Sequence, residues 1–326
     1  MSGQRTSPQI LVTGGAGFIG ANLVRVLLDR GYGVTVLDDL SVGKTEYLDG
    51  LDITMVNGSI ADSDLVSTLA QSNDHVVHLA AQPGIADSLA DPRYNFEVNV
   101  RGTLNLLDAV RRQMSSSEQG VDDKARPLRS PRFVFASSNA VLGRQEPPGN
   151  EDKAPLPVSP YGAAKLASEA YCVAYYESWG LGTVALRFGN VYGPFSRHKN
   201  SVVSRFLKDI SEYSRIVVDG DGSQTRDFVY VADLCDAVVR ALESDVSGEV
   251  FHIATGIETS IRELANTMVS LAGGKPSVES GPTRPGDVAR SFSIVTKAQR
   301  YLGWTPHTDL RTGLRLTRDW FASNDM

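Results

Sequence analysis

Apolar runs and helix-like stretches alternate through the first half of the chain. Short runs at 10–13, 34–38, 53–56, 76–79, 133–136 and 183–186 are apolar almost throughout rather than at every second position, as expected of strands buried on both faces. Longer stretches at 19–30, 96–112 and 161–179 are typical of helices. This alternation predicts an α/β fold with a doubly wound parallel sheet.

The regular alternation of strands and helices ends after Arg187, where prolines and glycines are scattered and the predicted helices become shorter. We therefore expect two partly interleaved domains. The first is a Rossmann-type domain at 1–190 with a returning segment at about 228–254, and the second is a smaller C-terminal α/β domain at 191–326.

Two local features complete the predicted organisation. The polar stretch 115–130 is the one low-complexity segment and predicts a solvated surface loop. A last helix is expected at about 310–321, with Thr308 as its N-cap because a threonine hydroxyl can accept from the first-turn N–H groups.

Composition narrows the class of protein. The 326 residues include 32 basic and 38 acidic side chains, a net charge of −6 without a basic run, which disfavours binding to nucleic acid. No apolar stretch approaches the roughly 20 residues of a membrane helix, and residues 1–8 lack the apolar centre of an export signal. Cys172 and Cys235 are too few for a disulfide framework, so we expect a cytoplasmic protein without a membrane partner.

A glycine cluster follows the first predicted strand. Gly14, Gly17 and Gly20 recur at three-residue spacing in TGGAGFIG, where glycine permits a tight turn and lets a pyrophosphate approach the N–H groups of a helix N-terminus. Asp38 ends the second strand, where its carboxylate can accept from ribose hydroxyls and would repel a 2′-phosphate; Asp39 offers the same group. The sequence therefore predicts NAD rather than NADP.

A second group of residues can move protons. Tyr161 and Lys165 lie one helical turn apart on the same face, and Ser138 follows a strand whose C-terminal end lies at the ligand-binding edge of a parallel sheet. A tyrosine base at neutral pH needs its pKa lowered by roughly 2–3 units, which a lysine cation and an oxidised nicotinamide can favour. We predict that these three residues are catalytic. No metal is expected, because the histidines at 75, 78, 198, 252 and 307 lack metal-ligand spacing.

From about Gln9 to Trp320 the sequence resembles the extended short-chain dehydrogenase/reductases. The resemblance is carried by TGGAGFIG at 13–20, HLAAQ at 78–82, SSNAVLG at 137–143, SPYGAAK at 159–165, LRFGNVYGP at 186–194, GDGSQTRDFVYVAD at 220–233, RPGD at 284–287 and LGW at 302–304. Within that group the chain looks most like the nucleotide-sugar 4-epimerases of the UDP-glucose 4-epimerase type.

The resemblance implies further contacts with NAD. The implied cofactor-binding residues beyond those above are Phe18 and Ile19 over the pyrophosphate, Ser59 and Ile60 near the adenine, Ala80, Ala81 and Gln82 along the phosphates and ribose, the supporting Asn99, and Tyr161 and Lys165 themselves. Ser59 departs from the usual aspartate, which puts its adenine contact in doubt.

It also implies a UDP-sugar as the substrate. Ser138 would bind the sugar's 4-hydroxyl, Asn190 and Arg226 the diphosphate, and Arg284 and Asp287 the phosphate and ribose. Leu142 stands in place of a tyrosine of the sugar pocket, and Asp219 lies where some members stack an aromatic ring on the base. The helices at 96–112 and 161–179 pair across a two-fold axis in similar proteins, so a homodimer is expected.

The residues after Ser138 discriminate among reactions. Similar dehydratases and decarboxylases have acidic residues there, whereas Asn139 and Ala140 are neither acids nor bases. We therefore predict NAD-dependent 4-epimerisation through a transient 4-keto sugar. The alternatives are a UDP-glucuronate 4-epimerase, for which Arg197 would bind the carboxylate, a 4,6-dehydratase, a UDP-glucuronate decarboxylase, and a non-catalytic NAD-binding protein.

Overall fold

The computed structural model describes residues 7–117, 131–283 and 288–324. The chain divides into two compact units, which are described separately below. The first comprises residues 1–144, 154–187 and 235–251, and the second comprises 145–153, 188–234 and 252–326. The returning segment is thus shorter than the predicted 228–254, and the short excursion at 145–153 has no counterpart in the predicted division.

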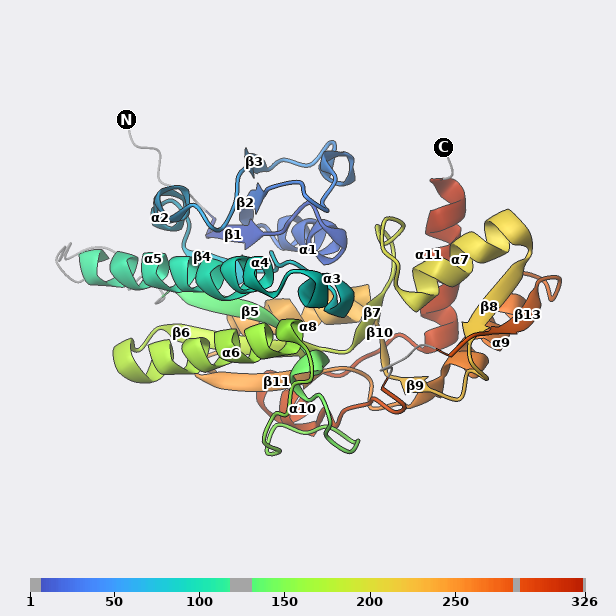
Figure 1. The fold of residues 1–326 in the computed structure, drawn as a ribbon. Helices are drawn as coiled ribbons and strands as arrows, with labels where there is room; N and C mark the ends of the chain where they lie inside the picture. The colour runs from blue at the N-terminus through green and yellow to red at the C-terminus, as the bar shows by residue number, and fades with distance from the viewer. Residues whose placement is uncertain (1–6, 118–130, 284–287, 325–326) are drawn as a thin grey trace. The chain divides into compact units, whose positions relative to one another are not determined.

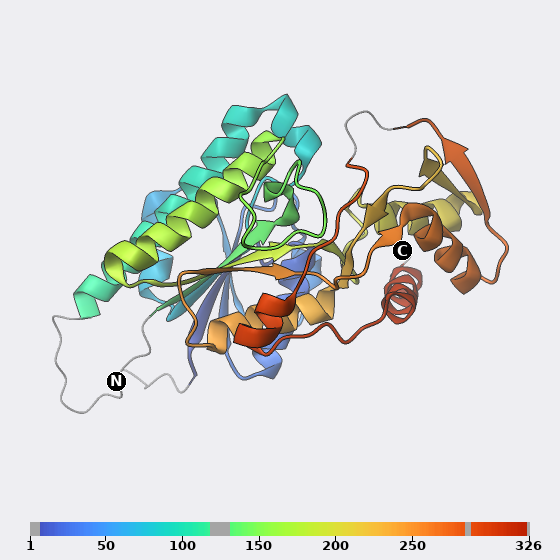
Figure 2. The same ribbon diagram turned by 90° about the horizontal axis from the view of Figure 1, so that it is seen from below.

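A seven-stranded sheet forms the centre of the first unit (Figures 1 and 2), in the order β11-β6-β5-β4-β1-β2-β3. Its strands are β1 (Gln9–Thr13), β2 (Gly33–Asp38), β3 (Thr54–Asn57), β4 (His75–His78), β5 (Arg132–Ser138), β6 (Gly182–Phe188) and β11 (Glu249–Ile253). β1 pairs in parallel with both β2 and β4. The order reverses at β1, which confirms the predicted doubly wound parallel sheet and brings the C-terminal ends of β1, β2 and β4 to one edge.

Helices cover both faces of this sheet. They are α1 (Phe18–Asp29), α2 (Ser63–Gln71), α3 (Ile85–Ala90), α4 (Pro92–Phe96), α5 (Gly102–Ser117), α6 (Pro160–Trp179) and α8 (Val231–Glu243). Figures 1 and 2 show α5 and α6 side by side on one face, with α1 and α8 on the other. Leu106 and Leu107 of α5 are fully buried in a cluster with Phe133 and Phe135 of β5, which anchors the sheet to these helices.

The helix predicted at 96–112 is longer and irregular. It begins in α4, passes through a π-helical turn at Glu97–Arg101 and continues as α5 to Ser117. The predicted loop 115–130 is therefore wrong at 115–117, which are helical, and its residues 118–130 lie outside the described part of the chain. The sequence concealed this last turn because residues 115–117 are three serines, which show no apolar periodicity and have modest helix propensity.

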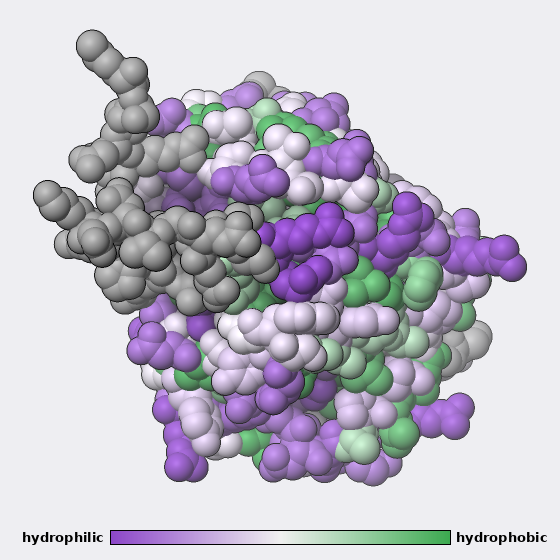
Figure 3. All heavy atoms as spheres, turned by 90° about the vertical axis from the view of Figure 1, so that its left-hand side faces the viewer, coloured by the Kyte–Doolittle hydropathy of each residue, from purple (hydrophilic) through white to green (hydrophobic). Residues whose placement is uncertain are grey.

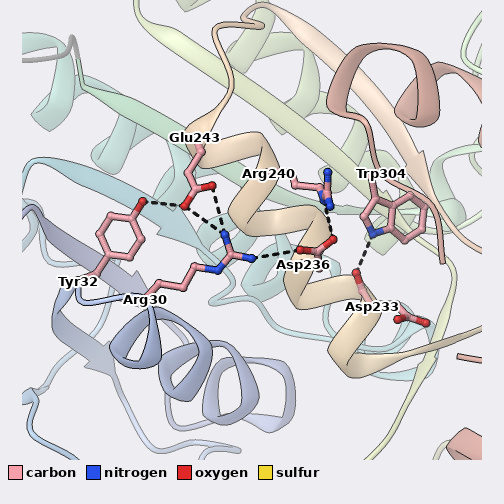
Figure 4. A network of polar contacts seen from close by, with 7 residues as sticks. All are labelled: Arg30, Tyr32, Asp233, Asp236, Arg240, Glu243 and Trp304. Carbon is pink, nitrogen blue, oxygen red and sulfur yellow. Dashed lines mark hydrogen bonds and ion pairs between the residues drawn. The ribbon is translucent and has the colours of Figure 1, made fainter. Parts of the chain in front are cut away.

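Ionic contacts attach α8 to α1 (Figure 4). Arg30, next to the end of α1, contacts Asp236 at 3.4 Å and Glu243 at 3.3 Å, and Tyr32 donates to Glu243 at 3.0 Å. Arg240 also donates to Asp236, at 2.6 Å. These exposed ion pairs each contribute little free energy, but together they fix which face of α8 meets α1.

The second unit contains three small two-stranded sheets. Its elements are β7 (Asn190–Tyr192), α7 (Val202–Tyr213), β8 (Arg215–Asp219), β9 (Thr225–Arg226), β10 (Phe228–Tyr230), β12 (Thr259–Ser260), α9 (Ile261–Leu271), β13 (Ser277–Gly281), α10 (Thr296–Leu302) and α11 (Leu310–Ser323). β7 pairs with β10 and β8 with β13, both in parallel, whereas β9 pairs with β12 in the antiparallel sense. This mixed α/β unit is smaller than the first.

The start of α11 corrects one prediction. Asp309, rather than Thr308, is the N-cap, and its side chain accepts from the N–H of Thr312 at 2.9 Å. Thr308 instead donates its N–H and hydroxyl to the carboxylate of Asp233, while Trp304 donates its indole N–H to the Asp233 carbonyl (Figure 4). An aspartate and a threonine are equally suitable caps from sequence, so a tertiary contact decided between them.

None of the helices in the described residues is long and apolar enough to cross a membrane. Figure 3 shows the face at the C-terminal ends of α5 and α6, where hydrophilic and hydrophobic side chains are interspersed. Single apolar side chains on such a surface are ordinary.

Candidate active site

The glycine turn after β1 is held by close backbone contacts. Gly14 has φ +71°, and a Cβ there would lie 2.7 Å from the backbone nitrogen of Ala80. A Cβ on Gly20 would collide with the Gly14 carbonyl. Gly17, the N-cap of α1, differs because a Cβ there would meet only the Gly14 carbonyl, at 3.3 Å. Packing therefore requires glycine at 14 and 20, whereas Gly17 leaves space over the N-terminus of α1 and, as the N-cap residue, has no side chain to cap it.

The first residues of α1 complete this turn. Phe18 is buried and Ile19 is half-buried, so the start of the helix is anchored in the core while its N–H groups point out of the turn. An anion placed there gains both hydrogen bonds and the positive end of the helix dipole.

Asp38 is fixed at the end of β2. Its carboxylate is 7% exposed and accepts from the N–H groups of Ala16 at 3.0 Å and Leu40 at 2.9 Å. Burial raises the pKa of Asp38 above its ordinary value, and the two backbone hydrogen bonds oppose that rise. One N–H occupies each carboxylate oxygen, which leaves acceptor capacity for ribose hydroxyls. Asp39 is exposed and accepts from the N–H and hydroxyl of Ser41 instead.

The segment after β3 presents the next predicted residues. The Ser59 hydroxyl accepts from the N–H of Ala61 at 3.2 Å, so it closes a local turn. Ile60 is buried, and Asn105 of α5 donates to its carbonyl at 3.0 Å. The backbone of this segment is thus anchored to α5.

The segment after β4 is held by two asparagines. Asn99 accepts from the N–H of Gln82 at 2.8 Å and donates to the Gln82 carbonyl at 3.2 Å. Asn95 donates to the Gln82 side chain at 2.9 Å. Ala80 and Ala81 lie half-buried at the start of the same segment. The predicted supporting role of Asn99 therefore has a geometric basis, while Asn95 was missed because nothing in its local sequence marks it.

A directed chain of hydrogen bonds fixes the protonation of His78. The Thr103 hydroxyl donates to the Asn99 carbonyl at 2.6 Å, so it must accept from Nε2–H of His78 at 3.0 Å. Nδ1 of His78 then accepts from the hydroxyl of Thr13 at 2.7 Å. Burial and the charge of Lys165 hold the pKa of His78 well below its usual range, so the ring is neutral and ties the sheet edge to α5.

Helix α6 carries the predicted proton-transfer residues. Its N-cap Ser159 accepts from Gly162, and Pro160 occupies the first turn, which sets the helix start one residue before Tyr161. Tyr161 shares a side-chain hydrogen bond with Ser138, at the end of β5. Lys165 is 3% exposed and donates to the Ala136 carbonyl at 2.9 Å, with Nζ 5.9 Å from the Tyr161 ring centroid. The structure thus brings these three side chains together.

Their pKa values reflect burial. Burial raises the pKa of Tyr161 above 10, and the hydrogen bond from Ser138 opposes this. Burial lowers the pKa of Lys165 to about 8, against the attraction of Glu169. The chain's own groups therefore do not produce the lowered tyrosine pKa expected from the sequence, although the geometry places an ammonium beside the phenol.

In the second unit, Asn190 and Arg226 lie near each other. Asn190 begins β7, and its N–H donates to the carbonyl of Asp227, the neighbour of Arg226. Arg226 donates to the carbonyls of Thr225 at 2.6 Å and Val288 at 2.7 Å. The predicted Arg284 and Asp287 lie outside the described residues.

Arg197 contacts the end of α11. Its guanidinium donates to the carbonyl of Asn324 at 3.0 Å and lies 5.9 Å from the Phe321 ring centroid, at the C-terminal end of α11. A cation there complements the helix dipole, which gives Arg197 a structural partner.

Comparison with known proteins identifies the family of this chain. The profile of the NAD dependent epimerase/dehydratase family matches residues 10–254. The chain belongs to this family. It is 37% identical to a UDP-glucose 4-epimerase of Mycolicibacterium smegmatis, over 96% of this chain and 98% of that protein. It is 32% identical to a dTDP-glucose 4,6-dehydratase of Streptomyces niveus, over 97% of this chain and 93% of that protein. The crystal structure of a Thermotoga maritima UDP-glucose 4-epimerase with UDP-glucose superposes with a TM-score of 0.87 at 34% identity, covering 97% and 99%.

Membership confirms the predicted cofactor and the predicted family. The family depends on NAD, and the open space at Gly17, at the start of α1, and the anchored Asp38 carboxylate fit the pyrophosphate and ribose of NAD. The protein is thus an NAD-dependent enzyme of the nucleotide-sugar epimerase/dehydratase class.

Proposed function

We propose that this enzyme is a 4-epimerase of a UDP-hexose of the UDP-glucose/UDP-galactose type. The observation that supports this most is the convergence of Ser138, Tyr161 and Lys165 at the end of β5, followed by Asn139 and Ala140. Epimerisation needs one proton acceptor at the 4-hydroxyl, whereas elimination of water needs a further acid and base. Dehydration and decarboxylation are therefore disfavoured.

Each residue has a defined task in the proposal. Ser138, which donates to the phenol oxygen in the substrate-free site, donates to the sugar's 4-oxygen once the substrate is bound. The 4-hydroxyl then gives its proton to Tyr161 as the C4–H bond breaks, and Lys165 supplies positive charge beside the phenolate. When bound, NAD would supply the acceptor for the C4 hydride and the source of its return, and its oxidised ring would add positive charge next to Tyr161. The proton goes back to the oxygen after the ketone has turned its other face, so the sugar ends with C4 inverted.

Asn190 and Arg226, with Arg284 and Asp287, bind the UDP portion in this proposal. A guanidinium can donate two parallel bonds to a phosphate, which suits Arg226. A neutral hexose is favoured over a uronate because Arg197, the candidate carboxylate ligand, donates to the end of α11. These assignments retain the division into a cofactor domain and a substrate domain.

We propose a cytoplasmic homodimer. Apolar side chains of α4 and α6 are exposed in the single chain: Tyr94 at 48%, Phe96 at 54%, Tyr171 at 41% and Trp179 at 50%. Helices that present aromatic side chains to solvent can pair with a second copy across a two-fold axis. The two buried free cysteines fit a reducing compartment.

Product analysis tests the function. Purified protein is incubated without added NAD with UDP-glucose, UDP-galactose, UDP-N-acetylglucosamine or UDP-glucuronate, and the sugars are identified by NMR. We expect interconversion of UDP-glucose and UDP-galactose, and Tyr161→Phe should lose at least about 10³-fold in kcat while retaining NAD. Tyr301→Phe, which removes the hydroxyl of an exposed tyrosine in α10, is the matched control. Full turnover by Tyr161→Phe, or a 4-keto-6-deoxy product, contradicts the proposal.

A further inference from the structure

A buried ion pair lies one helical turn beyond Lys165. Glu169 of α6 accepts from Arg187, at the end of β6, through two hydrogen bonds of 2.9 and 2.8 Å. The two side chains are only 3% and 5% exposed. This bidentate arrangement fixes the position of the carboxylate relative to both elements.

The same carboxylate binds the strand that presents Ser138. The hydroxyl of Ser137 donates to Oε1 of Glu169 at 2.5 Å, and Ser137 is fully enclosed. Since Lys165 donates to the Ala136 carbonyl, β5 and α6 are joined at consecutive residues, once through the lysine and once through the glutamate. Glu169 therefore links the ends of β5 and β6 to the helix that carries Tyr161.

Stability alone is a weak reason for this arrangement. Desolvating two charges is costly, and apolar side chains of similar volume often serve a core as well or better. Within the described residues, Nη1 of Arg187 has no hydrogen-bond partner, so the guanidinium is not fully satisfied. The buried Glu169 carboxylate has a further role if the side chains beside it depend on its negative charge.

We propose that Glu169, held by Arg187 and Ser137, is a positioning residue that keeps Lys165 protonated and in register with Ser138. This inference rests on the proposed function, which makes Lys165 and Ser138 catalytic. Glu169 would act through Lys165 without touching the sugar. Arg187 would hold the Glu169 carboxylate in place, and its positive charge would partly offset the effect of that carboxylate on Lys165.

The charges around Lys165 give the direction of the effect. On its own helix it faces the phenol of Tyr161, the Glu169 carboxylate and the Cys172 thiol; His78 lies towards it from β4 and Arg187 from β6. His78 is neutral, and burial raises the pKa of the Cys172 thiol, so Glu169 is the anion that counters desolvation of the lysine. Without it, Lys165 should lose its proton at a lower pH.

The test measures Lys165 directly. The protein is labelled with ε-¹³C lysine and titrated by NMR, and the Lys165 resonance is assigned by its loss in Lys165→Arg. We expect a midpoint near pH 8 in the unmodified chain. Glu169→Gln should lower it by about one pH unit. Glu177→Gln, at an exposed position of the same helix, should leave it unchanged.

A double variant protects the test against misfolding. Glu169→Gln leaves Arg187 buried without a counter-charge, which can prevent folding, whereas Glu169→Gln with Arg187→Met leaves no uncompensated charge. In the double variant the midpoint of the Lys165 titration should still fall, but by less than in Glu169→Gln. The reason is that Lys165 then loses both the close negative charge of Glu169 and the more distant positive charge of Arg187. An unchanged midpoint in either folded variant overturns the proposal.

Kinetics separate this inference from the proposed function. The alkaline limb of the kcat–pH profile for UDP-glucose epimerisation should move to lower pH together with the NMR midpoint. Ser137→Ala, which retains both charges, should lower kcat about tenfold with KM and the midpoint unchanged. If Tyr161→Phe turns over normally, the proposed function fails. If Tyr161→Phe is inactive while the Glu169 variants match the unmodified protein, only the role of Glu169 fails.

Discussion

The two units differ in how deeply they bury their candidate site residues. In the first, Asp38, Asn99 and Lys165 are buried, and each bonds to backbone groups of another segment, so folding itself sets their positions. In the second, Arg226 and Arg197 also donate to backbone carbonyls of distant segments, but both side chains are only half-buried. The cofactor residues are thus fixed by the core, whereas a half-buried arginine that binds phosphate can exchange a carbonyl for the anion and gains the stronger, charged hydrogen bond.

The largest effect should come from breaking the glycine turn. Gly14→Ala forces a side chain into φ +71° and against the Ala80 backbone, which should cost about 2–4 kcal/mol of unfolding free energy and weaken NAD binding more than about 100-fold. Urea unfolding and calorimetry measure the two effects.

Gly31→Ala is the matched control. Gly31 has φ +81°, but nothing lies within 4 Å of a Cβ built there. Gly31→Ala should lower the free energy of unfolding by only about 1–2 kcal/mol and leave NAD affinity intact. Equal losses in the two variants would mean that backbone strain, not the closeness of Ala80, explains Gly14.

An intermediate effect is expected from the arginines of the second unit. Arg226→Gln should raise KM for the UDP-sugar about 10- to 100-fold with NAD binding unchanged, because a charged hydrogen bond to phosphate is lost. Arg197→Gln should leave KM unchanged and lower the unfolding free energy by at most about 1 kcal/mol through weaker capping of α11. A selective loss of UDP-glucuronate turnover in Arg197→Gln would restore the uronate alternative.

The smallest effect concerns acid stability. Arg290 and Thr225 lower the pKa of Glu258 in the second unit to about 2. This group therefore contributes stability above its ordinary pKa near 4.5, and that contribution is lost as pH falls from about 4.5 towards 2. The Tm difference between the unmodified chain and Glu258→Gln should shrink over this range.

Asp38 supplies the contrast in the first unit. Burial raises its pKa, so the folded chain takes up a proton more readily there, and protonation during acidification favours the fold. NAD affinity should nevertheless fall over the same pH range, because a protonated Asp38 accepts ribose hydrogen bonds less well.

The sequence was most informative where chemistry depends on local chain geometry. The turn at Gly14, the strand end at Asp38 and the helical spacing of Tyr161 and Lys165 involve neighbouring residues, and their structural context agrees with the pattern. The doubly wound parallel sheet follows from the same local runs, although its strand order was not predicted.

Tertiary pairing was not predictable from such patterns. Nothing near Arg197 indicates that its partner is the end of a helix more than 120 residues away, and nothing near Thr308 indicates that Asp233 competes for its N–H. The link from Ser137 through Glu169 to Arg187 joins three elements, so no single window of sequence contains it. A charged residue at an otherwise buried helix position, such as Glu169, is the one signal that was available.

The π-helical turn at Glu97–Arg101 has a consequence for how this chain could change in length. It amounts to one extra residue in an α-helix, and within it the Asn99 carbonyl accepts from both Thr103 and Ser168. Because the turn absorbs the extra residue, deleting one residue there would restore a regular α-helix and leave Leu106 facing the core. The same deletion would displace Asn99 from Gln82, so the helix would tolerate a shortening that the segment after β4 would not.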